Sequence, residues 1–161
     1  MTMLRTMFAF GLCLMLSGCE SKPGYRPAVH PVSGTLRVAG EPAVNGEVVL
    51  YPVGGKEQPV VRPHGTVQSD GSFHLTTFAT RDGAPVGDFA LTVTWPGPRV
   101  KGQAEDEPGP DRLDHRYADP KRPAASIHIG PETKELATID LKPVEGKPAK
   151  PATTSKPNIE F

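Results

Sequence analysis

Residues 88–95 read Asp-Phe-Ala-Leu-Thr-Val-Thr-Trp, the most regular alternation of apolar and polar side chains in this 161-residue chain. The large apolar side chains occupy every second position: Phe89, Leu91, Val93 and Trp95. Successive side chains of a β-strand point to opposite faces, so this pattern predicts a strand with one buried face. We expect the hydrophobic core to be built around this strand.

Other short segments carry a similar signal, and none shows a helical period over ten or more positions. The expected strands cover 32–38, 46–51, the two arms of a hairpin at 69–71, 88–95, 125–129 and 136–142. Nineteen prolines and seventeen glycines further disfavour helices. Short strands without helices bury their apolar faces best in two packed sheets. The sequence therefore predicts an all-β fold, a seven-stranded antiparallel β-sandwich.

The alternation also predicts which side chains face the core. In the strand over 32–38 the expected buried positions are Val32, Gly34, Leu36 and Val38. Residues 46–51 are apolar on both faces, which is typical of an interior strand. In the last two strands the expected buried side chains are Ile127, Ile129, Ala137, Ile139 and Leu141.

The hairpin around Ser69-Asp70-Gly71 can be tested for register. A two-residue Asp-Gly loop would pair Val67 with His74 and place apolar and polar side chains on one face. A three-residue loop, in which a type I turn ends with Gly71 in the left-handed region, pairs Val67 with Phe73 instead. We expect the second register, with a positive φ at Gly71.

The amino-terminal segment contains Arg5, an apolar run over 7–16, and then the sequence Leu16-Ser17-Gly18-Cys19. As a helix the run would rise only about 15 Å, against roughly 30 Å of membrane hydrocarbon, so it is too short to span a bilayer. The order of charge, apolar run, small residues and cysteine resembles the lipobox of a bacterial lipoprotein signal peptide. The resemblance implies that residues 1–18 are removed and that Cys19 becomes the lipidated first residue.

The remaining chain divides into three parts by composition. Residues 19–31 combine the expected lipidated cysteine with a Pro-rich, charged spacer, 32–142 form the expected sandwich, and 143–161 form a Pro- and Lys-rich tail expected to be disordered. Cys13 lies in the segment to be removed and the sulfur of Cys19 would carry lipid, so no disulfide is expected. The domain must therefore be held together by its core.

Charge excludes some classes of partner. The chain has 18 basic and 18 acidic residues, and loss of Arg5 with the signal segment leaves 17 against 18. A balanced chain has no global field to attract nucleic acid or anionic lipid, so we expect no nucleic-acid partner. Attachment to the membrane would come from the amino-terminal lipid, because two or more acyl chains anchor a protein stably.

Several motifs together suggest a family. The segments Val-Ser-Gly-Thr-Leu at 32–36, Gly-Glu-Pro-Ala at 40–43 and Gly-Glu-Val-Val-Leu-Tyr-Pro at 46–52 resemble the opening of carboxypeptidase regulatory-like domains. The segments at 69–73 and 87–94 look like the middle strands of that fold. The runs at 82–87 and 117–120 are similar to those of bacterial lipoproteins of unassigned function that carry this domain. The resemblance implies a transthyretin-like, Ig-like β-sandwich acting as an accessory or structural module.

Two relatives of similar architecture catalyse reactions, and neither pattern is met here. Hydroxyisourate hydrolases end in Tyr-Arg-Gly-Ser, whereas this chain ends in Asn-Ile-Glu-Phe. Intradiol dioxygenases place two Tyr and two His around iron, and the tyrosines here, Tyr25, Tyr51 and Tyr117, lack that spacing to histidine. The sequence also contains no Gly-x-Ser-x-Gly elbow and no phosphate-cradling glycine loop before a helix. We predict that the protein is not an enzyme and needs no cofactor.

Candidate ligand-binding residues are few. The histidines form no close pair suited to a metal, and alternation places His74 and His128 opposite core residues, facing solvent. The long loop over 96–123 is rich in mixed charges but lacks the spacing of a calcium-binding loop. Sandwich domains bind partners through end loops, so this loop and the turn over 79–86 are the candidate recognition segments. Asp82 and Asp88, which flank that turn, are interpreted as turn formers rather than paired catalytic carboxylates.

Two functions remain open. The leading prediction is a lipid-anchored cell-envelope protein, facing the periplasm or the exterior, whose sandwich contacts an envelope protein or polysaccharide. The alternative is a carbohydrate- or peptide-binding accessory module that serves an envelope enzyme; an unrecognised hydrolase is disfavoured by the missing motifs. Because Glu20, rather than Asp, follows Cys19, the outer membrane is favoured over the inner.

Overall fold

The computed structural model describes residues 26–54, 61–104 and 106–144, and these residues form β-strands and turns without a helix. The strands in chain order are β1 (Val29–His30), β2 (Ser33–Val38), β3 (Glu41–Pro42), β4 (Glu47–Pro52), β5 (His64–Thr66), β6 (Ser72–His74), β7 (Ala84–Pro85), β8 (Gly87–Thr94), β9 (Ala125–Ile129) and β10 (Ile139–Leu141). The expected all-β class is confirmed, while the expected seven strands are divided into more and shorter pieces.

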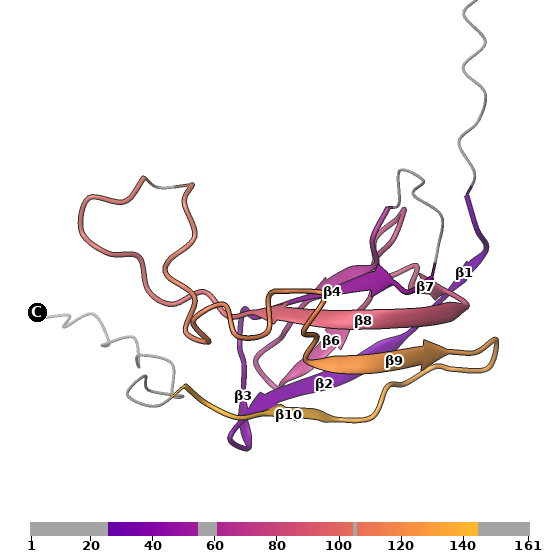
Figure 1. The fold of residues 1–161 in the computed structure, drawn as a ribbon. Coiled ribbons are helices and arrows are strands. Elements are labelled where there is room, and N and C mark those ends of the chain that lie inside the picture. The colour runs from indigo at the N-terminus through magenta and orange to yellow at the C-terminus, as the bar shows by residue number, and fades with distance from the viewer. Residues whose placement is uncertain (1–25, 55–60, 105, 145–161) are drawn as a thin grey trace, which may run out of the picture.

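Two four-stranded sheets form the body of the molecule (Figure 1). One sheet has the order β5-β4-β8-β9, and all its pairs are antiparallel. In the other, β2 pairs with β10, β3 and β6, while β1 and β7 form a separate two-stranded ribbon. β4 lies between β5 and β8, which confirms it as an interior strand.

One pairing differs from the expected antiparallel arrangement, because β10 runs parallel to β2, with Ile139 beside Leu36 and Leu141 beside Val38. After β9 the chain turns at 130–133 and crosses to the other sheet instead of folding back beside β9. The crossing is fixed where Ser33 N donates to the carbonyl of Lys134 and Leu136 N donates to that of Ser33. β10 therefore enters its sheet from the same end as β2.

The core lies between the sheets and is built around β8, as the sequence predicts. Trp95 is 1% exposed, and Phe73, Leu36, Leu50 and Leu91 are completely buried. One face prediction was wrong: Ala137 is exposed, and its neighbour Leu136 is buried instead. The reason is that β10 begins only at Ile139, so the period-two alternation does not extend back to Ala137.

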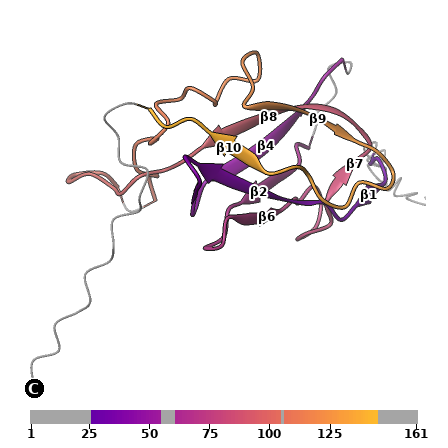
Figure 2. The same cartoon turned by 90° about the horizontal axis from the view of Figure 1, so that it is seen from below.

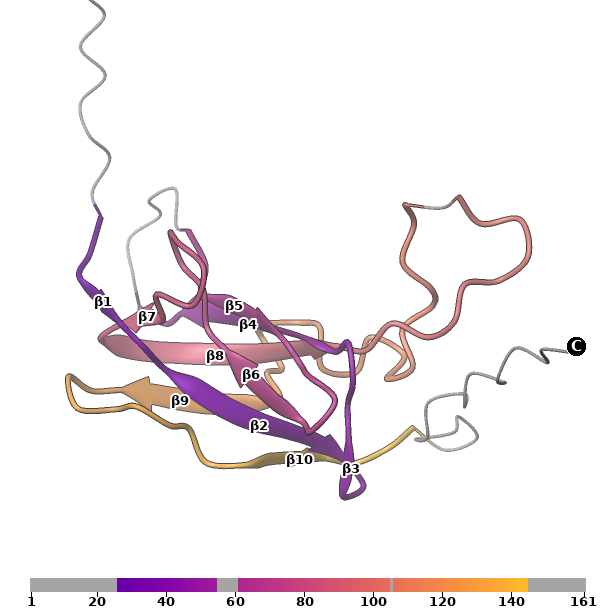
Figure 3. The ribbon, with the colours of Figure 1, turned by 180° about the vertical axis from the view of Figure 1, so that it is seen from behind.

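The hairpin between β5 and β6 has the predicted register. Gln68 N donates to the carbonyl of Ser72 at 2.7 Å, and Gly71 has a φ of +91°. His64 and Thr76 pair in the same register. In the view from below, β2 lies between β10 and β6 (Figure 2). Because β5 belongs to one sheet and β6 to the other, the hairpin joins the two sheets along one side (Figure 3).

The sandwich has two distinct ends, visible from the front and from behind (Figures 1 and 3). At one end lie β1, the turn over 78–83 and the turn over 130–134; we call this the N-terminal end. The long loop over 96–123 leaves from the opposite end, which we call the loop end, and β10 also finishes there. β1 lies within residues 19–31, for which the sequence predicts a spacer. The end of that segment instead forms a strand, because Val29 and His30 pair with β7.

Candidate functional site

The long loop at the loop end is held by a narrow stem. Gly97 N donates to the carbonyl of Pro110, and Arg112 N donates to the carbonyl of Trp95, each at 2.8 Å. A side chain at Gly109 would collide with the carbonyl oxygen of Gly97, so the two strands of the stem approach at a distance that only glycine permits. The loop is therefore attached to the end of β8 at a defined point.

Asp111 is the residue that organises this stem. It is only 8% exposed, although it belongs to a loop that is otherwise rich in solvent-facing charges. One carboxylate oxygen accepts hydrogen bonds from Trp95 N at 2.8 Å and Leu113 N at 3.0 Å, and the other accepts from His115 N at 2.8 Å. The carboxylate thus joins the end of β8 to the returning segment of the loop, and it lets Leu113 enter the core.

Trp95 lies beneath the stem and faces the core, as predicted. Its indole Nε1 donates to the carbonyl of Val44 at 3.0 Å, and the guanidinium of Arg112 lies 3.6 Å from its ring centroid. Burial lowers the pKa of Arg112, which still leaves it fully protonated at neutral pH. Because the ring is covered by Arg112 and buried below, Trp95 offers no open aromatic surface to a ligand.

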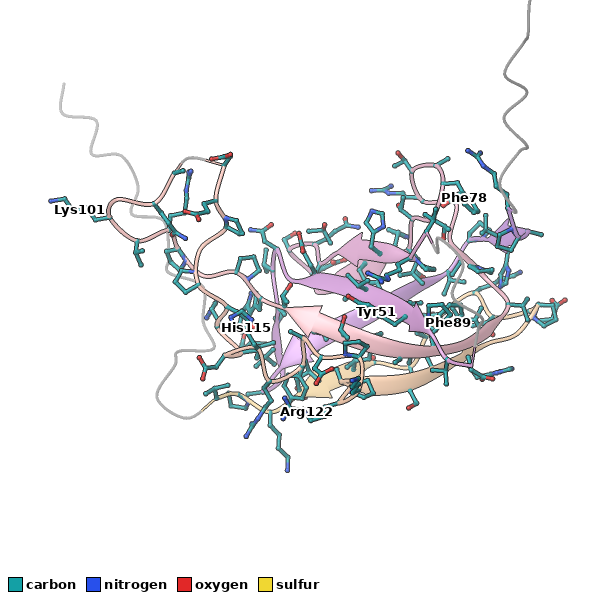
Figure 4. All side chains as sticks on the ribbon, turned by 45° about the horizontal axis from the view of Figure 1, so that its top comes forward. Tyr51, Phe78, Phe89, Lys101, His115 and Arg122 are labelled. Atoms are coloured by element: carbon teal, nitrogen blue, oxygen red, sulfur yellow. The ribbon has the colours of Figure 1, made fainter. Side chains whose placement is uncertain are left out.

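The outer part of the loop, 98–104 and 106–108, projects away from the sandwich (Figure 4). Gln103 bridges it, accepting from Val100 N and donating to the carbonyl of Pro108. Lys101 lies at its tip, while His115 and Arg122 lie nearer the sheets. Within the described ranges no three metal-ligating side chains converge, here or elsewhere. The loop end therefore presents an exposed, mixed-charge surface on a stem fixed by Asp111.

The second candidate segment, the turn over 79–86, is organised by Asp82. Its carboxylate accepts hydrogen bonds from the backbone N–H groups of Thr77, Phe78 and Ala79 at 2.7–2.9 Å. Burial acts to raise the pKa of Asp82, but these hydrogen bonds outweigh it and hold the pKa below its ordinary value. The interpretation of Asp82 as a turn former is confirmed. The same interpretation of Asp88 was wrong, because Asp88 lies on β8 and pairs with His128 on β9.

Asp88 and His128 form a cross-strand pair that the sequence reading did not find. His128 Nδ1 lies 2.7 Å from Asp88 Oδ1, and both side chains are about 70% exposed. Their separation of 40 residues gives no local signal; only the β8–β9 register brings them together. In the described part of the chain no hydroxyl group is hydrogen-bonded to His128, so the pair lacks the nucleophile of a hydrolase triad. The predicted exposure of His74 and His128 is confirmed.

The predicted lipid-attachment sequence, Leu16, Ser17, Gly18 and Cys19, lies outside the described residues. Among the residues that are described, no helix is long and apolar enough to cross a membrane.

Comparison with known proteins places the chain in no family. No family model matches it, and no curated protein does. A solved structure, the major pilin subunit of Bacillus cereus, is similar at a TM-score of 0.40 and 14% identity, over 73% of this chain and 30% of the pilin chain. This chain thus corresponds to less than a third of that pilin. So distant a likeness leaves the function to be argued from the residues themselves.

Proposed function

We propose that this protein is a non-enzymatic, lipid-anchored cell-envelope protein whose β-sandwich serves as a structural or interaction module. The observation that carries the proposal is that the two ends of the sandwich differ. The chain enters at the N-terminal end, through β1, and the long loop leaves from the opposite end (Figure 1). An anchor upstream of β1 would therefore leave the loop end directed away from the membrane.

The chain length between the expected anchor and the sandwich supports this arrangement. Nine residues lie between Cys19 and Val29, which makes ten residue steps, and a fully extended chain covers at most about 3.5 Å per step, or roughly 35 Å in total. Such a reach keeps the N-terminal end close to the bilayer surface. The loop end, with its mixed charges and its Asp111-fixed stem, is the surface we assign to an envelope partner.

Acylation of Cys19 is tested by expressing the full chain in bacteria supplied with tritiated palmitate. We expect the wild-type protein to carry the label and to sediment with membranes, and Cys19→Ala to lose the label. Cys13→Ala is the matched control, because it changes the other cysteine within the segment to be removed, and it should stay labelled. Equal labelling of wild type and Cys19→Ala would refute the anchor.

The alternative is a carbohydrate- or peptide-binding accessory module that serves an envelope enzyme, and its carbohydrate-binding form receives less support. A glycan platform needs an exposed aromatic ring, and the chain's single tryptophan, Trp95, is 1% exposed beneath Arg112. Tyr51 is half-buried, and the guanidinium of Arg62 covers its ring at 4.4 Å. Neither ring is open for stacking, so the structural or interaction role is the one we favour.

A further inference from the structure

A hollow of about 430 Å³ opens at the N-terminal end of the sandwich, between β1, β6 and two turns. This volume lies within the range typical of small-ligand sites. Its polar lining consists of His30, Ser33, His74, Arg81 and Lys134, and the rest of the wall is proline and valine. No carboxylate is part of the lining, although the chain as a whole carries as many acidic as basic residues.

The basic groups converge from separate parts of the chain. His30 comes from β1, His74 from β6, Arg81 from the turn over 78–83, and Lys134 from the turn after β9. Within the described ranges neither Arg81 nor Lys134 forms an ion pair. Unneutralised basic groups around one concave surface focus a positive potential into it, which attracts an anion.

Arg81 is held in place by its backbone. Its φ is +60°, which is uncommon for a residue other than glycine, and its N–H donates to Thr76 Oγ1 at 3.0 Å. The carboxylate of the adjacent Asp82 is already occupied by three backbone N–H groups. The carboxylate of Asp82 thus anchors the turn, and among the described residues it forms no ion pair with Arg81.

His30 supplies a second observation. Its Nε2 atom is buried and has no hydrogen-bond partner, which costs stability because the nitrogen has left water without replacement. Because His30 also lines the hollow, an anion bound there would bring hydrogen-bond acceptors to this part of the wall. His74 and Arg81 also line a neighbouring hollow that contains His64, so imidazoles continue along this surface.

We propose that the hollow binds a phosphate group. Several donors approach from different directions, which suits the tetrahedral oxygens of phosphate better than the single plane of a carboxylate. The guanidinium of Arg81 can donate two parallel hydrogen bonds, while the ammonium of Lys134 acts as a point charge. The phosphate belongs either to a phospholipid headgroup or to a small soluble phosphate ester.

The test uses the full-length protein in phosphate-free maltoside micelles, with histidine rings labelled with carbon-13 for NMR. One arm adds glycerol phosphate, and the other adds a short-chain phosphatidylglycerol at the same concentration and ionic strength. We expect saturable shifts of the His30 and His74 signals, while the signal of His115, which lies at the loop end, stays unchanged. A response to both additives assigns the site to soluble phosphate esters, whereas a response to the lipid alone assigns it to a headgroup.

The variant Arg81→Gln with Lys134→Gln removes two positive charges from exposed positions and should weaken binding by roughly ten- to a hundredfold. Lys101→Gln with Lys121→Gln removes the same charge from the loop and should bind like the wild type. Unmoved His30 and His74 signals in both arms would overturn the proposal. An Arg81→Gln, Lys134→Gln protein that binds as tightly as the wild type would overturn it too. Neither result depends on acylation of Cys19.

Discussion

Replacing Asp111 with alanine should destabilise the whole domain rather than the loop alone. The change removes the acceptor for Trp95 N and Leu113 N, both of which are buried, and for the more accessible His115 N. A buried backbone donor left without a partner costs about 1–3 kcal/mol. Because water can reach His115, the two buried donors dominate, and the expected loss is about 2–6 kcal/mol.

A loss of this size is large against the 5–15 kcal/mol that typically stabilises a domain of this length. The assay is urea unfolding followed by the fluorescence of Trp95, which is the chain's single tryptophan and lies directly beneath the stem. With a slope of about 2 kcal/mol per molar urea, the middle of the usual range, the midpoint should fall by roughly 1–3 M. Asp111→Asn should fall between the two proteins, because its amide retains one accepting oxygen.

Asp106→Ala is the matched control, since it removes a carboxylate from the exposed outer part of the same loop. Its midpoint should equal that of the wild type within error. If Asp111→Ala unfolded within about 0.5 kcal/mol of the wild type, the hydrogen bonds of Asp111 would not hold the stem, and the assignment of a fixed loop end would be withdrawn.

Two further outcomes are expected. Gly71→Ala should lower the free energy of unfolding by about 1 kcal/mol or more, measured by the same urea titration, because φ is +91° and the added Cβ would lie 3.3 Å from the carbonyl of Leu36. Asp82, whose pKa is lowered in the folded protein, contributes stability above its unfolded pKa of about 3.9 and loses it as the pH falls through the folded value. Urea midpoints between pH 7 and pH 2 should therefore decline less steeply for Asp82→Asn, and identical slopes would contradict the role of its hydrogen bonds.

The parts of the fold that were predicted correctly are those with a local cause. The face of β8 follows from the alternation of Phe89, Leu91 and Val93, and the register of the β5–β6 hairpin follows from the conformation that Gly71 permits. Each signal lies within about ten residues of sequence. The period of the pattern and the chemistry of the turn were therefore sufficient, without knowledge of the remaining chain.

The parts that were missed depend on distant contacts. Asp111 is one acid among many in a mixed-charge loop, and only its hydrogen bond to Trp95 N, sixteen residues earlier, distinguishes it. The nearby Leu113 was the available signal, because an apolar residue in a polar loop needs a place in the core. Similarly, the parallel course of β10 depends on where the crossing segment meets Ser33, which no periodicity in 136–142 reveals.

The two proposed surfaces are separated by the rigid body of the sandwich. β8 begins at Gly87, near the turn that carries Arg81, and its end leads into the stem at Trp95; its eight residues span about 26 Å at roughly 3.3 Å each. Its inner face is completely packed, and a close-packed core does not deform continuously, so the separation is fixed. A phosphate at the N-terminal end and a partner at the loop end can therefore be bound at the same time. It follows that Arg81→Gln with Lys134→Gln should leave partner binding at the loop intact, and that Lys101→Gln with Lys121→Gln should leave the hollow intact.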